Sequence, residues 1–216
     1  MTLFDDLKAA IGETWEAYTR HEFVTRLGEG SLPLPVFQDY LVQDYRFLTQ
    51  FARANALAAY KGRTLAEIRE GAEALSVILE ETELHRRLTA RWGIPEPELD
   101  AAPEKMATVA YTRYVLDAGQ SGDLLDLHVA LAPCVIGYAE IGAALEPRRH
   151  EGHPYGEWIA EYSGEAFQAG AAAAVRRLDS LAEGALTERR FGELVRLFRA
   201  ATRLETDFWQ QAVDAQ

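Results

Sequence analysis

The chain has 216 residues, of which 48% are hydrophobic and 26% charged, and its formal net charge is −12. This balance is typical of a globular protein that forms its core without covalent cross-links. The acidic excess argues against nucleic acid as a partner, because proteins that bind nucleic acid carry a basic patch or stripe. The single cysteine excludes an internal disulfide framework and favours a reducing, cytoplasmic location.

No targeting or membrane segment is expected from the sequence. The first residues, MTLFDDLKAA, are acidic and amphipathic, whereas a secretion signal has a basic start and an apolar centre. The longest stretch of small apolar residues, 169–175, is far shorter than the roughly 20 residues that cross a bilayer. We therefore expect a protein that has no membrane partner.

Helical periodicity extends along almost the whole chain, and no segment shows the alternation of a strand. The pattern predicts helices over 3–27, 35–60, 64–92, 104–120, 123–146, 154–180 and 187–213. Short segments rich in glycine and proline separate these helices, and none is long enough to be a flexible linker. The sequence therefore predicts one all-α domain, a helical bundle over residues 1–216.

Two of the predicted helices place a carboxylate inside an apolar stripe. The first stripe consists of Phe37, Leu41, Asp44, Leu48 and Phe51, and the second of Phe191, Val195, Phe198, Thr202, Glu205 and Trp209. Burying an unpaired carboxylate is costly, so Asp44 and Glu205 must be paired, protonated or in contact with a ligand. A glutamate buried in apolar surroundings suits a general acid and base, because burial disfavours its charged form, and Glu205 is expected to be such a group. Structural pairing with arginines is the alternative.

The cysteine lies in the apolar segment LHVALAPCVIGYAEIGAAL, directly after Pro133. A lone cysteine is usually a small buried side chain, so a structural role is the first interpretation of Cys134. Helical spacing places Cys134 on the inward face, one turn before Tyr138. We also expect Pro133 to remove one helix hydrogen bond and to kink the helix there.

Three inward polar groups have aromatic neighbours: Asp44 with Phe47, Cys134 with Tyr138, and Glu205 with Phe208. Further inward aromatic candidates are Tyr111, Tyr114 and Tyr162. Together these groups favour a ligand pocket over three unrelated core positions. Aromatic rings stack on a flat heterocycle, and carboxylates accept hydrogen bonds from its amino groups, so the expected ligand is a nitrogen-rich ring.

Metal chemistry has weak support in the sequence. Glu81 and His85 are four residues apart and could hold one ion, with Glu140 as a further ligand. A di-iron site in a bundle needs a second carboxylate–histidine set, and no histidine follows His153. We therefore expect no metal site and a structural hydrogen-bonding role for His85. The GxSxG signature of a serine nucleophile is also absent.

Four segments carry a family resemblance: LVQDYRFLTQFA (41–52), LAPCVIGYAEIG (131–142), GHPYGEWIAEYSGEAF (152–167) and LETDFWQQA (204–212). In this order they resemble the TenA/thiaminase II family. The resemblance implies a haem-oxygenase-like fold without haem, a homotetramer, and hydrolysis of aminopyrimidines in thiamin salvage without a cofactor. The implied substrates are 4-amino-5-aminomethyl-2-methylpyrimidine and thiamin.

The resemblance also implies roles for individual residues. Cys134 matches the nucleophile, Glu205 the acid/base, and Asp44 the carboxylate that holds the ring's amino group and an adjacent nitrogen. The remaining matches are Tyr111 as a stacking ring, Tyr138 and Tyr162 as hydroxyl groups that contact the substrate, and Phe208 as an aromatic wall. Phe47 departs from the pattern, because many members have tyrosine there, so a hydroxyl donor is lost.

Two other functions stay open alongside the hydrolase. The family carries a historical label of transcriptional activator, so a regulatory protein that does not contact DNA directly is one alternative. A metal-dependent oxidase on the same scaffold is the other. How the Cys134 thiol becomes a thiolate is also open, because the chain is acidic and no lysine or histidine is near it in the sequence.

Overall fold

A computed structural model describes residues 1–215, except for the side chains of Glu81, Glu83, Leu84, Arg87 and Leu88. Within residues 1–215 the regular structure is helical and contains no strand, which confirms the predicted all-α class. The chain divides into two compact units. We call Met1–Leu32 with His128–Asp207 the cysteine unit, and Pro33–Leu127 with Phe208–Gln216 the aspartate unit. The single domain over 1–216 stays a prediction.

The cysteine unit begins with three short helices instead of the one helix expected over 3–27. They are α1 (Leu3–Ala10), α2 (Gly12–Thr19) and α3 (Glu22–Gly28). The helix between α1 and α2 is interrupted at Ile11, whose φ of −118° is not helical. His21 then caps α3, because its side chain accepts a hydrogen bond from the backbone N–H of Phe23.

The rest of the cysteine unit follows the sequence prediction with two further divisions. The run expected over 123–146 consists of α8 (Leu124–Ala132), the π-helical turn η1 (Pro133–Gly137) and α9 (Tyr138–Leu145). A short 3-10 turn, η2 (Glu146–Arg148), follows α9. The run expected over 154–180 consists of α10 (Gly156–Ser163) and α11 (Glu165–Ala182). Gly164, with an extended backbone, separates these two helices.

Aromatic rings and one half-buried ionic cluster hold the cysteine unit together. Trp15 stacks on Phe198 with ring centroids 5.4 Å apart, and Phe4 packs edge-on against both rings. Glu140 of α9 accepts hydrogen bonds from Lys8 Nζ at 2.7 Å and from Trp15 Nε1 at 3.0 Å. These contacts fix α1 and α2 on the helix that carries Cys134.

One helical run among the described residues, Leu124–Arg148, is long and apolar enough to cross a membrane. However, 72% of its most apolar window is buried inside the protein. A helix that is apolar on every side and covered by protein is typical of the core of a soluble protein. The run therefore serves as a core helix, and Cys134 lies at its centre.

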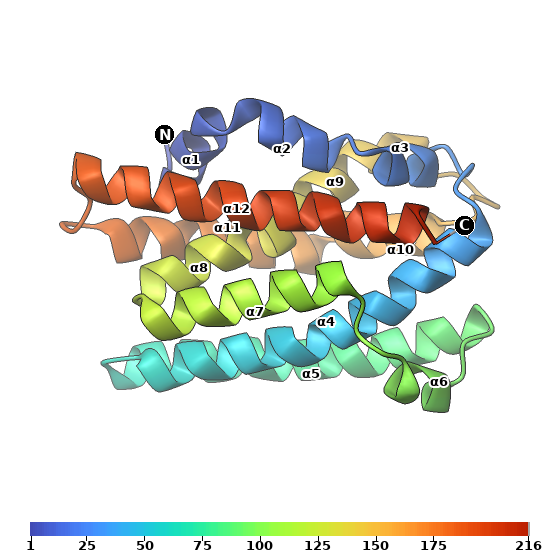
Figure 1. Ribbon diagram of the computed structural model, residues 1–216, viewed down its shortest axis with the longest axis horizontal. Coiled ribbons are helices and arrows are strands. Elements are labelled where there is room, and N and C mark those ends of the chain that lie inside the picture. Colours follow the sequence, from blue (N-terminus) through green and yellow to red (C-terminus); the bar gives the residue numbers. More distant parts are fainter. Residues whose placement is uncertain (216) are drawn as a thin grey trace. The chain divides into compact units, whose positions relative to one another are not determined.

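The aspartate unit is built on α4 (Leu34–Lys61), α5 (Leu65–Arg91), α6 (Glu96–Ala101) and α7 (Met106–Ser121). Helix α5 returns antiparallel along α4, and α7 packs on α4 (Figure 1). A capping box between Thr64 and Glu67 begins α5. A Cβ atom at Gly71 would lie 2.5 Å from the backbone nitrogen of Ala59, so glycine permits this close packing of α4 and α5.

The last long helix, α12 (Glu188–Val213), confirms the predicted helix over 187–213 and contributes residues to both units. Helix α6 was not predicted, because the sequence between 92 and 103 contains prolines that are typical of a loop. Pro95 instead occupies the N-cap position of α6, and Pro97 lies in its first turn, where proline is tolerated.

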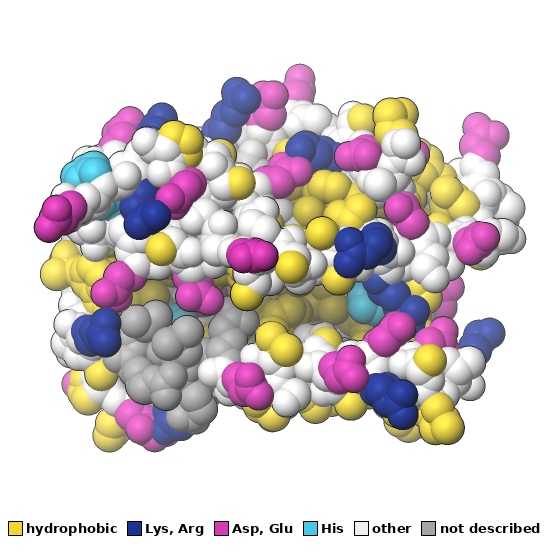
Figure 2. Space-filling view, turned by 180° about the vertical axis from the view of Figure 1, so that it is seen from behind, with side chains coloured by type: hydrophobic (Ala, Val, Ile, Leu, Met, Phe, Trp, Pro, Cys, Tyr) yellow, Lys and Arg dark blue, Asp and Glu magenta, His cyan; other side chains and the backbone are white. Residues whose placement is uncertain are grey.

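Charged side chains of both signs are mixed on the face shown in Figure 2. Among the side chains drawn there, lysine and arginine are scattered between aspartate and glutamate and form no continuous basic stripe. This distribution agrees with the acidic composition of the chain. The expected lack of a nucleic-acid partner stays a prediction.

Candidate functional site

Cys134 lies on the π-helical turn η1 and is buried, with 9% of the residue exposed.

 The thiol donates a hydrogen bond from Sγ to the Leu131 carbonyl at 3.0 Å. The inward orientation is confirmed, because Cys134 and Tyr138 are both buried on the core side of this run. A π-turn is rare and occurs often at functional positions.

At Pro133, where the sequence predicted a kink, the structure has this π-turn, a feature at which helices can bend. The backbone keeps helical angles at Ala132 and at Tyr138, so the run continues through the proline without a break. The Tyr18 hydroxyl donates to the Pro133 carbonyl at 3.1 Å. A Cβ atom at Gly137 would lie 2.6 Å from the Tyr18 ring, so glycine leaves the space that Tyr18 needs.

Tyr138 and Tyr162 are brought together in the cysteine unit, with ring centroids 5.0 Å apart. Trp158 lies against both rings, at 6.1 Å from Tyr138 and 4.5 Å from Tyr162. All three residues are buried. Gly142 makes this packing possible, because a Cβ atom there would lie 2.5 Å from the backbone carbonyl carbon of Tyr162. Trp158 was missed in the sequence, although it lies one turn before Tyr162.

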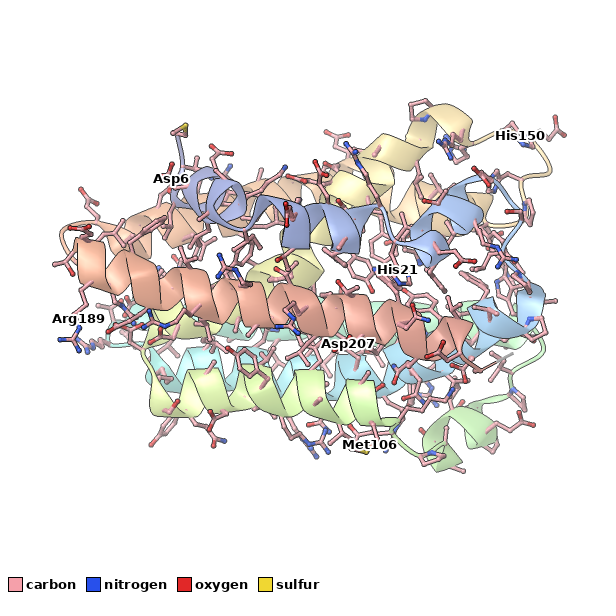
Figure 3. The ribbon with its side chains drawn as sticks, turned by 45° about the horizontal axis from the view of Figure 1, so that its top comes forward. Asp6, His21, Met106, His150, Arg189 and Asp207 are labelled. Atoms are coloured by element: carbon pink, nitrogen blue, oxygen red, sulfur yellow. The ribbon has the colours of Figure 1, made fainter. Side chains whose placement is uncertain are left out.

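Glu205 is buried on α12, with 1% of the residue exposed, which confirms its predicted inward position. Its neighbour one turn earlier, Thr202, is fully buried and donates its hydroxyl to the Phe198 carbonyl at 2.9 Å. Asp207, two residues further along, is exposed (Figure 3). On α12, therefore, Glu205 faces the interior and Asp207, less than one turn away, faces solvent.

Asp44 is the buried acid of the aspartate unit, with 5% of the residue exposed. Burial raises the pKa of its carboxyl group from 3.8 to about 7, although a hydrogen bond from the Tyr40 side chain opposes the shift. Its Oδ2 atom lies 3.5 Å from His85 Nδ1. Among the described side chains its partners are thus Tyr40 and His85, so the arginine pairing considered from the sequence is not observed there.

Three of the predicted aromatic residues form one cluster in the aspartate unit. Phe47 stacks on Tyr111 with centroids 5.3 Å apart and planes at 24°, and Phe208 lies 6.0 Å from Phe47. All three are buried, whereas the further candidate Tyr114 is only half-buried. Tyr40 extends the cluster, 6.2 Å from Phe208. The sequence analysis missed Tyr40, although it precedes Asp44 by one helical turn.

Two of the sequence-level metal candidates can be placed. His85 Nε2 lies 3.0 Å from the Leu41 carbonyl and its Nδ1 faces Asp44, which confirms the expected hydrogen-bonding role. Glu140 is held by Lys8 and Trp15. The side chain of Glu81 lies outside the described part of the chain. Among the described residues no group of three or more histidine, cysteine, aspartate or glutamate side chains could hold a metal ion.

The structure therefore places Cys134, Tyr138, Tyr162 and Glu205 in the cysteine unit, and Asp44, Phe47, Tyr111 and Phe208 in the aspartate unit. The contacts it establishes are those within each unit. That both sets face one ligand stays a prediction, as do the individual roles.

The helical structure of residues 1–215 has the haem-oxygenase-like fold expected from the sequence. The chain belongs to the TENA/THI-4/PQQC family, which it matches over residues 8–215. The family resemblance is thereby confirmed.

The similarity to known proteins extends over nearly the whole chain. It is 39% identical over 202 residues to the aminopyrimidine aminohydrolase of Halalkalibacterium halodurans, covering 92% of this chain and 89% of that protein. It is 31% identical over 217 residues to the aminopyrimidine aminohydrolase of Bacillus subtilis, covering 98% and 90%. A solved structure described as a TenA family transcription regulator, from Silicibacter sp. TM1040, has a TM-score of 0.92 at 41% identity, covering 97% and 96%.

Proposed function

We propose that this protein is a cysteine-dependent hydrolase of aminopyrimidines in thiamin salvage. The observation that carries the proposal is the buried Cys134 on a π-turn. Tyr138 follows it by one helical turn, and the ring of Tyr138 packs against that of Tyr162 on α10. Two relatives named aminopyrimidine aminohydrolase support it, because they align with more than nine-tenths of the chain.

The reaction consumes one water for each substrate molecule. With 4-amino-5-aminomethyl-2-methylpyrimidine, water replaces the exocyclic amine, giving the hydroxymethyl pyrimidine and ammonia. With thiamin, the same pyrimidine product forms and the thiazole leaves. An aminopyrimidine is a poor electrophile until a ring nitrogen is protonated, so the protein must supply an acid as well as a nucleophile.

The proposed roles follow from the chemistry of each side chain. Cys134 adds to the activated ring, and its thiol proton, which now points to the Leu131 carbonyl, passes to the departing amine or, with thiamin, to solvent. Glu205 protonates the ring and later accepts a proton from the attacking water. Departure of the amine or thiazole precedes attack by water, and release of the thiol regenerates the free cysteine.

The other residues are proposed to bind the ring. Asp44 holds the amino group and the adjacent nitrogen, and Tyr111 stacks on the ring face. Tyr138 and Tyr162 supply hydroxyl groups. Phe47 and Phe208 supply apolar walls, and both are already packed in one aromatic cluster with Tyr111.

The same proposal includes a cytoplasmic homotetramer that needs no metal or organic cofactor. The resemblance supports the tetramer, and the single free cysteine agrees with a reducing compartment. Light scattering on the purified protein tests the oligomeric state, since a tetramer of this 24.1 kDa chain has four times the monomer mass.

A side-by-side assay tests the function. Purified protein is incubated with the aminomethyl pyrimidine or with thiamin, in the presence of a chelator, and ammonia, thiazole and the hydroxymethyl pyrimidine are quantified. We expect at least one of the two substrates to be turned over, at a rate that the chelator does not reduce. Loss of all turnover on chelation, restored by a metal, would instead support the oxidase or another metal-dependent activity.

A regulatory role is the second candidate, since one structural relative is described as a transcription regulator. Retardation of duplex DNA that persists at high salt would favour direct regulation. We expect none, because binding by an acidic protein would have to overcome charge repulsion with the phosphates.

A further inference from the structure

His85 is a largely buried titratable residue that the proposed reaction does not use. Its ring lies between two groups of α4: Nε2 is 3.0 Å from the Leu41 carbonyl, and Nδ1 is 3.5 Å from Asp44 Oδ2. The ring of Tyr45 stacks on the imidazole with centroids 6.4 Å apart and planes at 26°. The orientation of the imidazole is therefore set by contacts on both of its nitrogens and on one face.

The Leu41 carbonyl determines which nitrogen carries the proton. A carbonyl oxygen only accepts hydrogen bonds, so Nε2 must be the N–H nitrogen at this position. In the neutral imidazole Nδ1 then has a lone pair and no proton. Contact between that lone pair and an ionised Asp44 is unfavourable, so the pair is stable when it holds one further proton.

The surroundings decide where that proton resides. An ion pair of Asp44 and a charged His85 would require two buried charges, which is costly without further hydrogen bonds. Burial accordingly raises the pKa of Asp44 and lowers that of His85. Both effects favour a protonated carboxyl group that donates from Oδ2 to Nδ1.

The other titratable and charged side chains around the pair have partners of their own among the described residues. On α4 the Tyr40 hydroxyl bonds to Asp44. The contacts of the remaining groups are Tyr45 with Asp100, Asp39 with Lys105, and Arg86 with Glu96. Among the described side chains, His85 is thus the basic one that faces the Asp44 carboxyl group directly.

We propose that His85 is a positioning residue that acts through Asp44, keeping this carboxyl group protonated in the free protein. This inference rests on the proposed function for its consequence: when substrate binds, the carboxyl O–H turns from His85 Nδ1 to a ring nitrogen, while the other carboxyl oxygen accepts from the neighbouring amino group. That donor–acceptor pair is complementary to the neutral edge of an aminopyrimidine. The proton stays within the complex, so no external acid is required for recognition.

Two variants separate the nitrogens of His85. In His85→Gln the amide nitrogen can retain the bond to the Leu41 carbonyl, but the acceptor at Nδ1 is lost. In His85→Asn the amide oxygen can take the place of Nδ1, but the bond to Leu41 is lost. We expect the pKa of Asp44, followed by carboxyl carbon NMR, to fall by about one unit or more in His85→Gln and to recover in part in His85→Asn.

The wild-type protein supplies an independent readout that does not depend on folding of the variants. Nitrogen NMR of the imidazole at pH 7 should show a neutral ring protonated at Nε2. A charged ring, or an Asp44 pKa that is unchanged or higher in His85→Gln, would overturn the proposal. Neither measurement needs substrate, so the result is distinct from failure of the hydrolase assay.

Discussion

The ring of Phe47 stacks on the ring of Tyr111, with centroids 5.3 Å apart and planes at 24°. This is the position at which the chain departs from the tyrosine common in the family that it resembles. The aromatic wall is retained, because Phe47 also lies 6.0 Å from Phe208 and is buried. What the substitution removes is a hydroxyl group, and its effect can be measured by restoring it.

We expect Phe47→Tyr to increase kcat/KM for the preferred aminopyrimidine by about threefold to tenfold, which is about 1 kcal/mol of transition-state stabilisation. The added hydroxyl should lower stability slightly, because burying it without a partner is unfavourable. Steady-state kinetics and thermal unfolding measure the two effects. An unchanged kcat/KM would show that this chain does not use a hydroxyl at position 47.

Asp44→Asn should stabilise the protein at high pH. The pKa of Asp44 is raised from 3.8 to about 7, so between these values the unfolded chain is ionised there while the folded chain is protonated. The free energy of unfolding of the wild type therefore falls as pH rises from about 4 to about 7, by up to about 4 kcal/mol. The free energy of unfolding of Asp44→Asn should not fall over this pH range, because asparagine does not ionise. The variant should also bind the aminopyrimidine more weakly.

Urea unfolding at pH 4.5, 6 and 8 measures this difference. Asp39→Asn is the matched control, because Asp39 forms an ion pair with Lys105 at 2.5 Å and should gain nothing at pH 8. If Asp44→Asn destabilised the protein equally at all three pH values, Asp44 would be an ionised structural residue.

Gly142→Ala should lower stability and activity together. The new Cβ atom would lie 2.5 Å from the carbonyl carbon of Tyr162, so α10 must move away from α9. Such overpacking costs about 1–3 kcal/mol, and the movement would displace the Tyr162 ring from Tyr138. Gly170→Ala on α11 is the control, because the space around it is open and alanine favours the helix.

The melting temperature and the rate of ammonia release of both variants test this account of the close packing. We expect a decrease of several degrees for Gly142→Ala and a small increase for Gly170→Ala. Equal behaviour of the two variants would mean that α9 and α10 can separate without consequence.

Periodicity predicted the helical regions, because burial of one face requires the same spacing in every helix. It also predicted which carboxylates are buried, since Asp44 and Glu205 interrupt apolar stripes that the structure places inside. The breaks at Ile11 and Gly164 were missed, since local propensity does not determine where helices change direction. The π-turn at Pro133 was expected as a kink, because the sequence shows the lost hydrogen bond but not how the backbone accommodates it.

Partners of the buried acids were harder to predict than their burial. His85 and Asp44 are 41 positions apart and lie on two different helices, so no spacing rule connects them. Tyr40 and Trp158 were missed for a simpler reason, since each lies one turn from a predicted site residue and could have been found by the same helical spacing.

The initial rate of ammonia release from 4-amino-5-aminomethyl-2-methylpyrimidine, compared between the wild type and Cys134→Ser, tests the central claim most directly. The serine variant should fold normally, since the side chains are nearly equal in size, and a melting curve checks this. We expect the rate to fall by at least about a hundredfold, because a serine hydroxyl is a far weaker nucleophile than a thiolate. A folded Cys134→Ser variant that releases ammonia at the wild-type rate would contradict the cysteine mechanism.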